Sequence, residues 1–334
     1  MSLISILMPV HNAAGTLRAA LRSVTAQSFR EWELVAVNDG STDESLEVLD
    51  QASRKDRRIR ILTGAHVGHV EALRSAASLA RGELLARMDA DDVMHPRRLI
   101  LQLTRLASPP NVDVVASRVR LAGRTGEGMR AYVEWQNRLL THEEIAANLF
   151  VESPLAHPTV LMRRDAFERA GGYRDPGWAE DYDLWHRMSE RGARFEKLPR
   201  ALLAWRDGEG RLSRTHKMYS EKAFYACRLH YFRRHPLCRS PIAVWGAGPT
   251  GRHWTRDLLR AGVEVPYAMD IDPRKIGRTI TDARVPVVSV EEGLSRRREG
   301  LVLGAVGSRG AREVMRGRLL TAGLVEARDF LFVA

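Results

Sequence analysis

Apolar runs and helical patterns alternate along the N-terminal part of this 334-residue chain, and this alternation constrains its fold more than any other feature. A continuous apolar run, typical of a buried strand, occupies residues 4–10, and further strand patterns occupy residues 33–38, 59–62 and 84–88. Helical patterns stand between them at residues 16–24, from residue 41 onward and at 70–80. Strands that alternate with helices build a mainly parallel sheet with both faces covered. The sequence therefore predicts an α/β fold.

Three carboxylates, Asp89, Asp91 and Asp92, follow the fourth apolar run. Aspartate is unfavourable in strands and clustered like charges repel, so the cluster is costly unless something neutralises it. Hard divalent cations take oxygen ligands, which makes Mg²⁺ or Mn²⁺ the expected partner. Asp39 follows the second run, and the carboxyl ends of parallel strands meet at one edge of a sheet. We therefore expect Asp39 and the cluster to share a site.

A further acidic pair, Glu180 and Asp181, opens a helical pattern that stops at Gly192. A carboxylate in the first turn lies near the positive end of the helix dipole, which favours its ionised form and suits a general base. Several candidate residues also have a purely structural interpretation. These are a turn residue for Asp39, helix caps for Glu180, Asp181 and Asp92, and satisfied polar side chains for His11 and His157.

The composition of the chain limits the kinds of binding partner and the cellular compartment that we expect. The 52 basic and 41 acidic residues give a net charge of +11, which suits a polyanionic neighbour such as nucleic acid, an anionic membrane or a phosphorylated substrate. The two cysteines, Cys227 and Cys238, exclude a disulfide framework and a four-cysteine zinc site. No apolar run approaches the roughly 20 residues that span a bilayer, and the N-terminus lacks a basic signal-peptide region. We expect a cytoplasmic protein.

A second domain begins after a boundary bracketed by Pro236 and Pro241. Its expected strands are residues 242–245, 265–271, 285–288 and 301–306, with helices ending at 261 and spanning 311–322. The glycines at 246, 248 and 251, with Asp270 after the second strand, match the dinucleotide fingerprint, so NAD(P) or another nucleotide is a possible ligand. About 95 residues make only half a dinucleotide fold, and we favour a binding or scaffolding role over hydride transfer.

The basic aromatic segment 213–240 is expected to be a helical linker between a first domain, 1–212, and a Rossmann-like domain, 241–334. Two interpretations of this linker remain open. It packs the two domains together, or it rests on an anionic membrane that holds a lipid-linked acceptor. The second interpretation would place the protein peripherally at the inner face of a membrane.

Several motifs occur in an order that resembles the family-2 glycosyltransferases, which have the GT-A fold. The resembling segments are 9–12 (PVHN), 27–29 (QSF), 37–43 (VNDGSTD), 80–83 (ARGE), 87–92 (RMDADD), 157–160 (HPTV), 171–173 (GGY) and 179–185 (AEDYDLW). As a set they are specific and cover roughly residues 3–210. Two departures are that Arg74 stands where the family often has Asn, and that the Q-x-x-R-W motif of processive synthases is missing.

The resemblance implies transfer of a sugar from a nucleotide donor, most commonly a UDP-sugar, to a hydroxyl of a glycan or lipid-linked acceptor, with inversion at the anomeric carbon. It implies that Asp39 contacts the base of the donor, Asp89 its ribose, and Asp91 the Mn²⁺ or Mg²⁺ on its diphosphate, with Asp181 as general base. Further residues that it places at the donor are Pro9, His11, Asn12 and Arg87. Those that it places at the acceptor or diphosphate are Glu180, Trp205 and Arg206.

Two other function classes remain open from the sequence. A non-catalytic sensor could use both nucleotide folds to bind a sugar nucleotide, although a sensor has no need of the base Asp181. A nucleic-acid binder could use the charge of +11, but the chain has no recognised nucleic-acid motif, and we expect no nucleic-acid partner.

Overall fold

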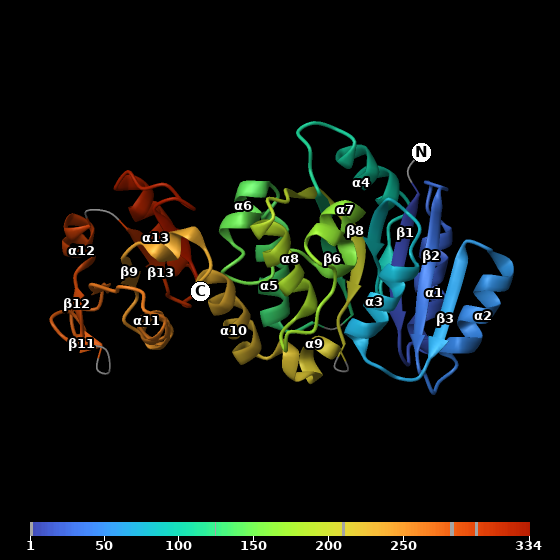
Figure 1. Cartoon of the computed structure of the whole chain (residues 1–334), viewed down its shortest axis with the longest axis horizontal. Helices are drawn as coiled ribbons and strands as arrows, with labels where there is room; N and C mark the ends of the chain where they lie inside the picture. The colour runs from blue at the N-terminus through green and yellow to red at the C-terminus, as the bar shows by residue number, and fades with distance from the viewer. Residues whose placement is uncertain (1–2, 124, 209–210, 281–283, 298–299) are drawn as a thin grey trace. The chain divides into compact units, whose positions relative to one another are not determined.

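The computed structural model describes residues 3–123, 125–208, 211–280, 284–297 and 300–334. The chain forms two compact units, and each is described by itself. Unit 1 comprises Met1–Ala146 and Ser153–Ala223, and unit 2 comprises Ala147–Glu152 and Phe224–Ala334. Figure 1 colours both from the N-terminus to the C-terminus.

Unit 1 is built on an eight-stranded sheet with the order β3-β2-β1-β4-β7-β6-β8-β5. Its strands are β1 (Ile4–Val10), β2 (Trp32–Asp39), β3 (Ile59–Gly64), β4 (Leu84–Arg87), β5 (Val93–Met94), β6 (Val114–Ala122), β7 (Leu161–Arg163) and β8 (Phe195–Arg206). The three pairings along β3-β2-β1-β4 are parallel, whereas β7 runs antiparallel to both neighbours. The sheet is thus mixed and mainly parallel, as expected.

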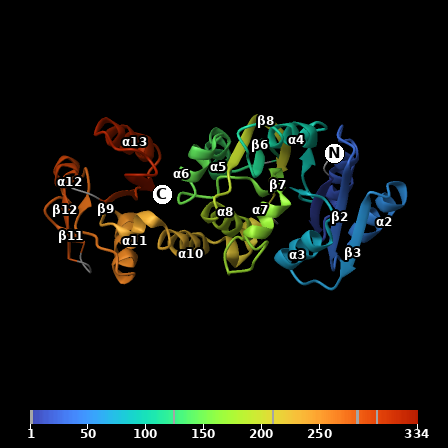
Figure 2. The ribbon, with the colours of Figure 1, turned by 45° about the horizontal axis from the view of Figure 1, so that its top comes forward.

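Helices cover both faces of this sheet. They are α1 (Ala14–Thr25), α2 (Ser45–Lys55), α3 (His69–Leu79), α4 (Arg98–Leu106), α5 (Glu127–Arg138), α6 (His142–Ala147), α7 (Arg164–Arg169), α8 (Glu180–Glu190) and α9 (Leu212–Thr215). Figures 1 and 2 show α2 and α3 on opposite sides of the strands β1 to β3. Every residue of β1 is therefore buried, which explains why its sequence is a continuous apolar run.

A glycine at the start of β4 shows how closely the strands pack. A Cβ on Gly82 would lie 2.4 Å from the carbonyl oxygen of Leu3 and 2.7 Å from the backbone nitrogen of Ser5. The backbone N–H of Gly82 donates to Ser5 Oγ (2.8 Å), and Ser5 Oγ donates to the buried Glu33 (2.6 Å). This part of the resembling motif 80–83 therefore supports the sheet.

The short strand β5 connects the carboxylate cluster to the far edge of the sheet. Val93 pairs with Ala204, and Met94 with Leu203, in antiparallel register with β8. Since β5 directly follows Asp92, this pairing brings the end of β8 to the carboxyl end of β4. Two strands that are distant in the sheet order therefore meet at the expected site.

Unit 2 contains a six-stranded sheet with the order β11-β12-β10-β9-β13-β14. Its strands are β9 (Ile242–Trp245), β10 (Ala268–Met269), β11 (Thr279–Ile280), β12 (Val285–Val288), β13 (Leu301–Gly304) and β14 (Phe330–Phe332). Its helices are α10 (Glu221–Phe232), which starts within unit 1, α11 (Pro249–Arg260), α12 (Val290–Arg296) and α13 (Ala311–Thr321). All pairings except β11 with β12 are parallel.

The five parallel strands of unit 2 follow the chain order 3-2-1-4-5 across the sheet, which doubly wound nucleotide-binding sheets share. This sheet is larger than the half dinucleotide fold expected from the length of the domain. The difference arises because the sequence analysis did not predict β14 and α12. The expected strand 265–271 is reduced to Ala268–Met269. The glycines at 123, 126 and 128 predict a loop at residues 123–129, but helix α5 begins at Glu127.

The structure contains no separate linker at 213–240 in the described part of the chain. The hydroxyl of Tyr219 donates to Glu180 in unit 1 (2.7 Å), whereas the hydroxyl of Tyr225 donates to Asp257 in unit 2 (2.8 Å). The segment is thus divided near residue 223 between the two units. The short segment 147–152 joins unit 2, where the ring of Phe150 packs edge-on against Phe232 (5.3 Å between ring centres).

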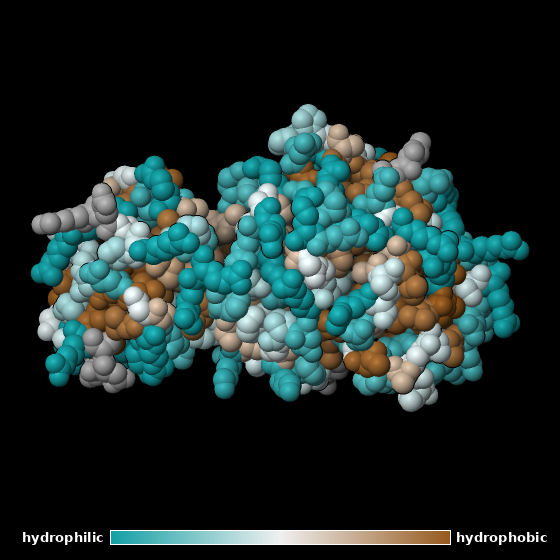
Figure 3. All heavy atoms as spheres, viewed as in Figure 1, coloured by the Kyte–Doolittle hydropathy of each residue, from teal (hydrophilic) through white to brown (hydrophobic). Residues whose placement is uncertain are grey.

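None of the helices in the described ranges has the length and apolar character needed to cross a membrane. On the face shown in Figure 3, apolar residues form separate patches among hydrophilic side chains, a surface typical of globular proteins.

Candidate active site

The candidate site lies in unit 1 at the carboxyl ends of β1, β2 and β4, where parallel sheets bind ligands. The amino-terminal ends of α3 and α8 and the end of β8 complete it. The described residues that meet there are 11–12, 39, 66–69, 87–92, 180–181, 206 and 211.

Asp39 is buried (3% exposed) and holds the segment that enters α3. Its Oδ1 accepts the backbone N–H of Val67 (2.6 Å), and its Oδ2 accepts that of Gly68 (3.0 Å) and lies 2.9 Å from His66 Nδ1. Both carboxylate oxygens thus have protein partners. A nucleobase could use only their remaining lone pairs.

The imidazole rings of His11 and His66 stack beside Asp39, with 4.2 Å between their centres. His11 Nδ1 lies 2.7 Å from the carbonyl oxygen of Asp39. Both rings are exposed, so they offer a flat surface at this end of the site. Asn12, with a positive φ of 48°, accepts the backbone N–H of Thr42 on its Oδ1 (2.8 Å). Pro9, by contrast, is buried within β1.

The three carboxylates after β4 converge as expected. Oxygen atoms of Asp89, Asp91 and Asp92 all lie within 4.8 Å of one another. Burial and the neighbouring Asp89 raise the pKa of Asp91 to about 6, and burial together with Asp89 and Asp91 raises that of Asp92 well above its usual range. One oxygen of the buried Asp92 has no hydrogen-bond partner among the residues that the structure describes. Carboxylate oxygens that repel one another in this way fit a divalent cation.

The other oxygen of Asp92 fixes the end of β8. It accepts the backbone N–H of Arg206 (2.8 Å), while Arg206 Nε donates to the carbonyl oxygen of Asp91 (2.9 Å). Trp205 is buried in the core, and the guanidinium of Arg211 lies over its ring, 4.6 Å from the centre. The positive charge of Arg211 acts on the carboxylates of the cluster and partly opposes the rise in the pKa of Asp91, so Arg211 belongs to the site.

Arg87 is almost fully buried (2% exposed) and connects the cluster to the rest of the site. Its Nη2 pairs with Asp89 (2.7 Å) and lies 3.5 Å from His69 Nε2. The Nε and Nη1 atoms of Arg87 are buried without a hydrogen-bond partner in the described residues. Because a buried guanidinium strongly favours anionic partners, Arg87 contributes positive potential beneath the carboxylates.

Glu180 is the centre of a buried hydrogen-bond network. One of its oxygens lies 3.3 Å from His69 Nε2 and 3.5 Å from His157 Nδ1, and the other accepts the hydroxyl of Tyr219 (2.7 Å). Burial alone would raise the pKa of Glu180, but the contacts from His157 and His69 lower it well below its usual range. Glu180 therefore remains ionised.

His157 is held neutral in this network. Burial and the charge of Arg87 lower its pKa to about 4. Its Nε2 lies 2.9 Å from the hydroxyl of Tyr173, so the tautomer with a proton on Nδ1 lets His157 donate to Glu180 and accept from Tyr173. His157 is therefore a buried polar side chain with its hydrogen bonds satisfied, which is the structural interpretation given for it in the sequence analysis.

Asp181 lies in the first turn of α8 and is partly exposed. Burial and the adjacent charge of Glu180 raise its pKa well above the usual range, while the backbone N–H of Tyr182 donates to its Oδ1 (2.7 Å). Two adjacent carboxylates thus have pKa values shifted apart. Such a pattern is typical of acid–base sites, and the partly exposed Asp181 is the member suited to proton transfer.

The structure brings together most of the candidates expected in unit 1. Residues that the sequence analysis did not assign to the site are His66, His69, Tyr173, Tyr219 and Arg211. For Arg211 a signal was available, since the basic residues Arg206, Arg211 and Arg214 stand at the end of β8 and shortly after it.

The candidate residues of unit 2 meet at the carboxyl end of β9. A Cβ on Gly246 would lie 2.7 Å from the carbonyl oxygen of Ala305, and one on Gly251 would overlap the carbonyl of Gly246, whereas Gly248 faces open space. Asp270 accepts the backbone N–H of Ala247 (2.8 Å), which braces the glycine turn. The glycine spacing thus reflects packing at two positions and leaves one open to a ligand.

Comparisons with known proteins agree with the family resemblance of the sequence motifs. Residues 5–171 match the family model described as Glycosyl transferase family 2. "Putative glycosyltransferase EpsE" of Bacillus subtilis (strain 168) is 30% identical over 237 residues, which cover 67% of this chain and 82% of that protein. "O-antigen biosynthesis glycosyltransferase WbnJ" of Escherichia coli is 28% identical over 232 residues, covering 68% and 89%.

Solved structures share the fold. S. aureus TarS 1-349 in complex with UDP-GlcNAc is similar with a TM-score of 0.56 and 18% identity, over 78% of this chain and 71% of that one. The mannosyltransferase PcManGT from Pyrobaculum calidifontis, in complex with GDP-Man and Mn²⁺, gives a TM-score of 0.50 and 17% identity, over 71% and 62%. The expected GT-A fold is confirmed.

Proposed function

Because the chain belongs to glycosyl transferase family 2, we propose that it transfers a sugar from a nucleotide-sugar donor to an acceptor hydroxyl, with inversion and without processive elongation. The observation that carries this proposal is the pairing of two features at one sheet edge. These are the converging carboxylates of Asp89, Asp91 and Asp92, and the partly exposed Asp181 with a raised pKa.

The donor would lie along the carboxyl ends of β1, β2 and β4. The stacked rings of His11 and His66 offer a flat face for the base, beside the fixed backbone at Asp39. Asp89, one oxygen of which pairs with Arg87, would accept a ribose hydroxyl on its other oxygen. Arg87 and Arg211 supply positive charge for the diphosphate.

The cation would be held by Asp91, with Asp89 and Asp92 close enough to take part. When bound, Mn²⁺ or Mg²⁺ stabilises the negative charge that develops on a nucleoside diphosphate leaving group. The relative PcManGT was solved with GDP-Man and Mn²⁺, and TarS with UDP-GlcNAc, which supports this class of donor and metal.

Asp181 would accept the proton of the acceptor hydroxyl. A carboxylate with a raised pKa is a stronger base than an ordinary aspartate. It can accept a proton only when the pH lies above its own pKa, because only then is it ionised. Glu180 stays ionised beside it and holds the first turn of α8 in place through His69, His157 and Tyr219. Attack by the acceptor opposite the leaving group would invert the anomeric carbon.

The acceptor is proposed to be a glycan or a lipid-linked glycan. The relative WbnJ carries the description O-antigen biosynthesis, which supports polysaccharide synthesis as the setting. For unit 2 we propose a binding or scaffolding role, with the open side of Gly248 as the place where NAD(P) or another nucleotide would approach.

The test is an assay of UDP-, GDP- and dTDP-sugars with Mn²⁺ and a panel of saccharide acceptors. We expect one donor to be consumed, with product of the opposite anomeric configuration by NMR, and Asp91→Asn to lose this activity. Full activity of Asp91→Asn would exclude the metal assignment. Tight donor binding without any transfer or donor hydrolysis would instead indicate the non-catalytic sensor.

A further inference from the structure

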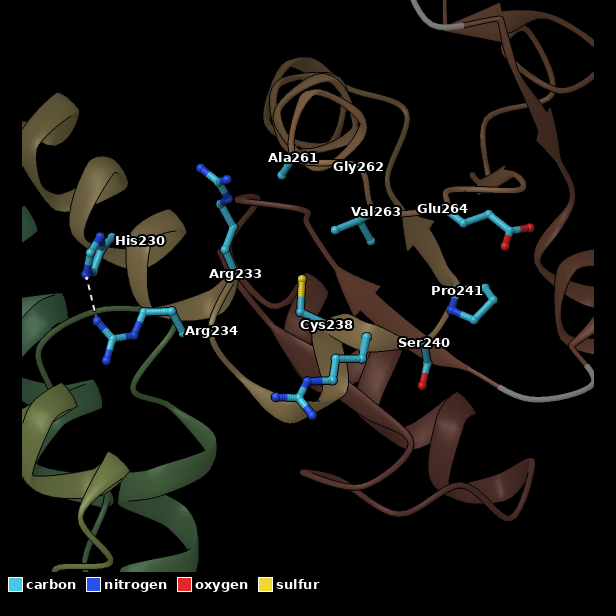
Figure 4. Close-up of a pocket in the computed structure, with 11 residues that line it drawn as sticks. His230, Arg233, Arg234, Cys238, Ser240, Pro241, Ala261, Gly262, Val263 and Glu264 are labelled. Atoms are coloured by element: carbon cyan, nitrogen blue, oxygen red, sulfur yellow. Dashed lines mark hydrogen bonds between the residues drawn. The ribbon is translucent and has the colours of Figure 1, made fainter.

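A cavity of about 700 Å³ lies in unit 2, away from the glycine turn. Its walls come from the end of α10 and the short helix Pro236–Arg239, from the residues before β9, and from the loop between α11 and β10 (Figure 4). The backbone N–H of Ile242 donates to the carbonyl of Glu264 (2.9 Å), which places the cavity at the amino end of β9. Gly246 is at the other end of that strand. We call this cavity the basic pocket.

The basic pocket concentrates positive charge. Arg233, Arg234 and Arg239 line it together with His230, and Glu264 is its single acidic lining residue. Figure 4 shows the carboxylate of Glu264 directed away from Arg233 and Arg234. No acidic side chain occurs anywhere between Glu221 and Asp257 in the sequence. The stretch of chain that supplies the arginines therefore contributes no negative charge to the pocket.

Two of these guanidinium groups, those of the exposed Arg233 and Arg239, form no ion pair or hydrogen bond within the part of the chain that the structure describes. Among the described residues, no carboxylate pairs with Arg233 or Arg239, whereas Arg234 lies 3.4 Å from His230. Most other arginines of unit 2 have partners, such as Arg316 with Glu326 (2.8 Å) and Arg297 with Asp329 (3.2 Å). Like charges around one cavity repel, and an anion inside it would remove that repulsion.

The frame that carries the arginines is rigid. Arg228 Nη1 donates to the carbonyl oxygens of Val151 (2.8 Å) and Val333 (3.1 Å), and Phe232 packs edge-on against Trp254 (5.5 Å). The helix Pro236–Arg239 is capped by His235, whose Nδ1 accepts the backbone N–H of Leu237 (3.3 Å). A preorganised frame reduces the entropy lost when an anion binds.

Apolar side chains also line the pocket, beside Ser240, and they indicate the kind of anion. Pro241, Ala261, Val263 and the buried Cys238 form a wall beside the arginines. A volume of about 700 Å³ is within the range of small-molecule sites and exceeds what an inorganic ion needs. Guanidinium groups match phosphate oxygens through paired hydrogen bonds. We propose that the basic pocket binds the phosphate or diphosphate group of an organic ligand.

This inference is independent of the proposed glycosyl transfer, and its test does not measure transfer. Binding of inorganic pyrophosphate to the full-length protein is measured by calorimetry, with a chelator present so that no cation bridges pyrophosphate to Asp91. The test variant is Arg233→Gln/Arg239→Gln. The matched control, Arg296→Gln/Arg318→Gln, removes the same charge from exposed positions on α12 and α13.

We expect the test variant to bind pyrophosphate at least roughly tenfold more weakly, because each lost charged hydrogen bond contributes that much or more. The control should bind like the wild type. Arg233→Lys/Arg239→Lys, which keeps the charge, should show intermediate affinity and an unchanged circular dichroism spectrum. Equal binding by the test variant and wild type, or no binding by the wild type, would overturn the proposal.

A second arm separates a soluble ligand from a lipid headgroup. Sedimentation with phosphatidylcholine vesicles is compared with and without phosphatidic acid. Arginine-dependent sedimentation with phosphatidic acid supports a headgroup as the ligand. Arginine-dependent binding of pyrophosphate without sedimentation supports a soluble phosphorylated ligand.

Discussion

Glu180 and Asp181 are adjacent in the first turn of α8, yet their surroundings shift their pKa values in opposite directions. Glu180 accepts contacts from two histidines and a tyrosine and stays ionised. Asp181 receives one backbone N–H and the repulsion of its neighbour. One helix turn therefore contains a fixed anion and a proton acceptor.

Exchange of these two carboxylates for amides should separate their roles. We expect Asp181→Asn to lower kcat by roughly 10²- to 10⁴-fold, the usual contribution of a general base, with little change in donor affinity. Glu180→Gln should lower both activity and thermal stability, because it changes a buried network. Measurements of single-turnover rate and donor Kd distinguish the two. A loss of donor binding in Asp181→Asn would indicate a structural role.

Metal binding should depend on pH through Asp91. Its pKa is raised from 3.8 to about 6 in the folded protein, so its neutral form stabilises the metal-free fold below pH 3.8, and this stabilisation is lost as pH rises through about 6. A cation competes with that proton. We expect the rise in Tm produced by Mn²⁺ to be small at pH 5 and large at pH 7. Asp91→Asn should show no such pH dependence; an equal shift at both pH values would contradict the assignment.

The hydroxyl of Tyr219 is expected to matter for catalysis as well as stability. Tyr219→Phe removes a 2.7 Å hydrogen bond to Glu180, a type worth about 1.5–3 kcal/mol. Tyr225→Phe is the matched control, because it removes a 2.8 Å hydrogen bond to Asp257 in unit 2. Both variants should unfold more easily in urea. Only Tyr219→Phe should lower kcat/KM, and equal activity of the two variants would remove Tyr219 from the site.

Gly82 should tolerate no side chain. A Cβ there would meet backbone atoms of Leu3 and Ser5 at 2.4 and 2.7 Å, so Gly82→Ala should destabilise the protein by about 1–3 kcal/mol. Gly126→Ala is a suitable control, because its added Cβ has no atom within 4 Å. Urea denaturation of both variants measures the difference. Similar midpoints would mean that the strand adjusts without cost.

The sequence predicted the part of the fold in which local pattern and burial agree. The run Ile4–Val10 is apolar because both faces of β1 are covered, and the carboxylates after β4 stand out against such a run. The first residues of helix α5 were predicted as a loop because Gly126 and Gly128 oppose helix formation locally, although Val133 and Gln136 are buried by tertiary packing.

The site could be predicted only where residues are close in sequence or belong to a motif. His69, Tyr219 and Glu180 are far apart in the sequence and meet through folding alone. The same holds for Arg206 and Asp92, which are joined because β5 pairs with β8. No pattern in a single sequence records such long-range contacts.

The first turn of α3 has a consequence for the choice of donor. Its entry is fixed by Asp39 at the base end of the proposed site, and its first residue, His69, contacts Glu180 next to the proposed proton acceptor. One short piece of backbone, held at both ends, therefore sets the distance between the base end of the proposed donor site and the proposed proton acceptor. We expect the site to measure donor length, so that donors longer or shorter than one sugar linked through a diphosphate lose reactivity before they lose binding.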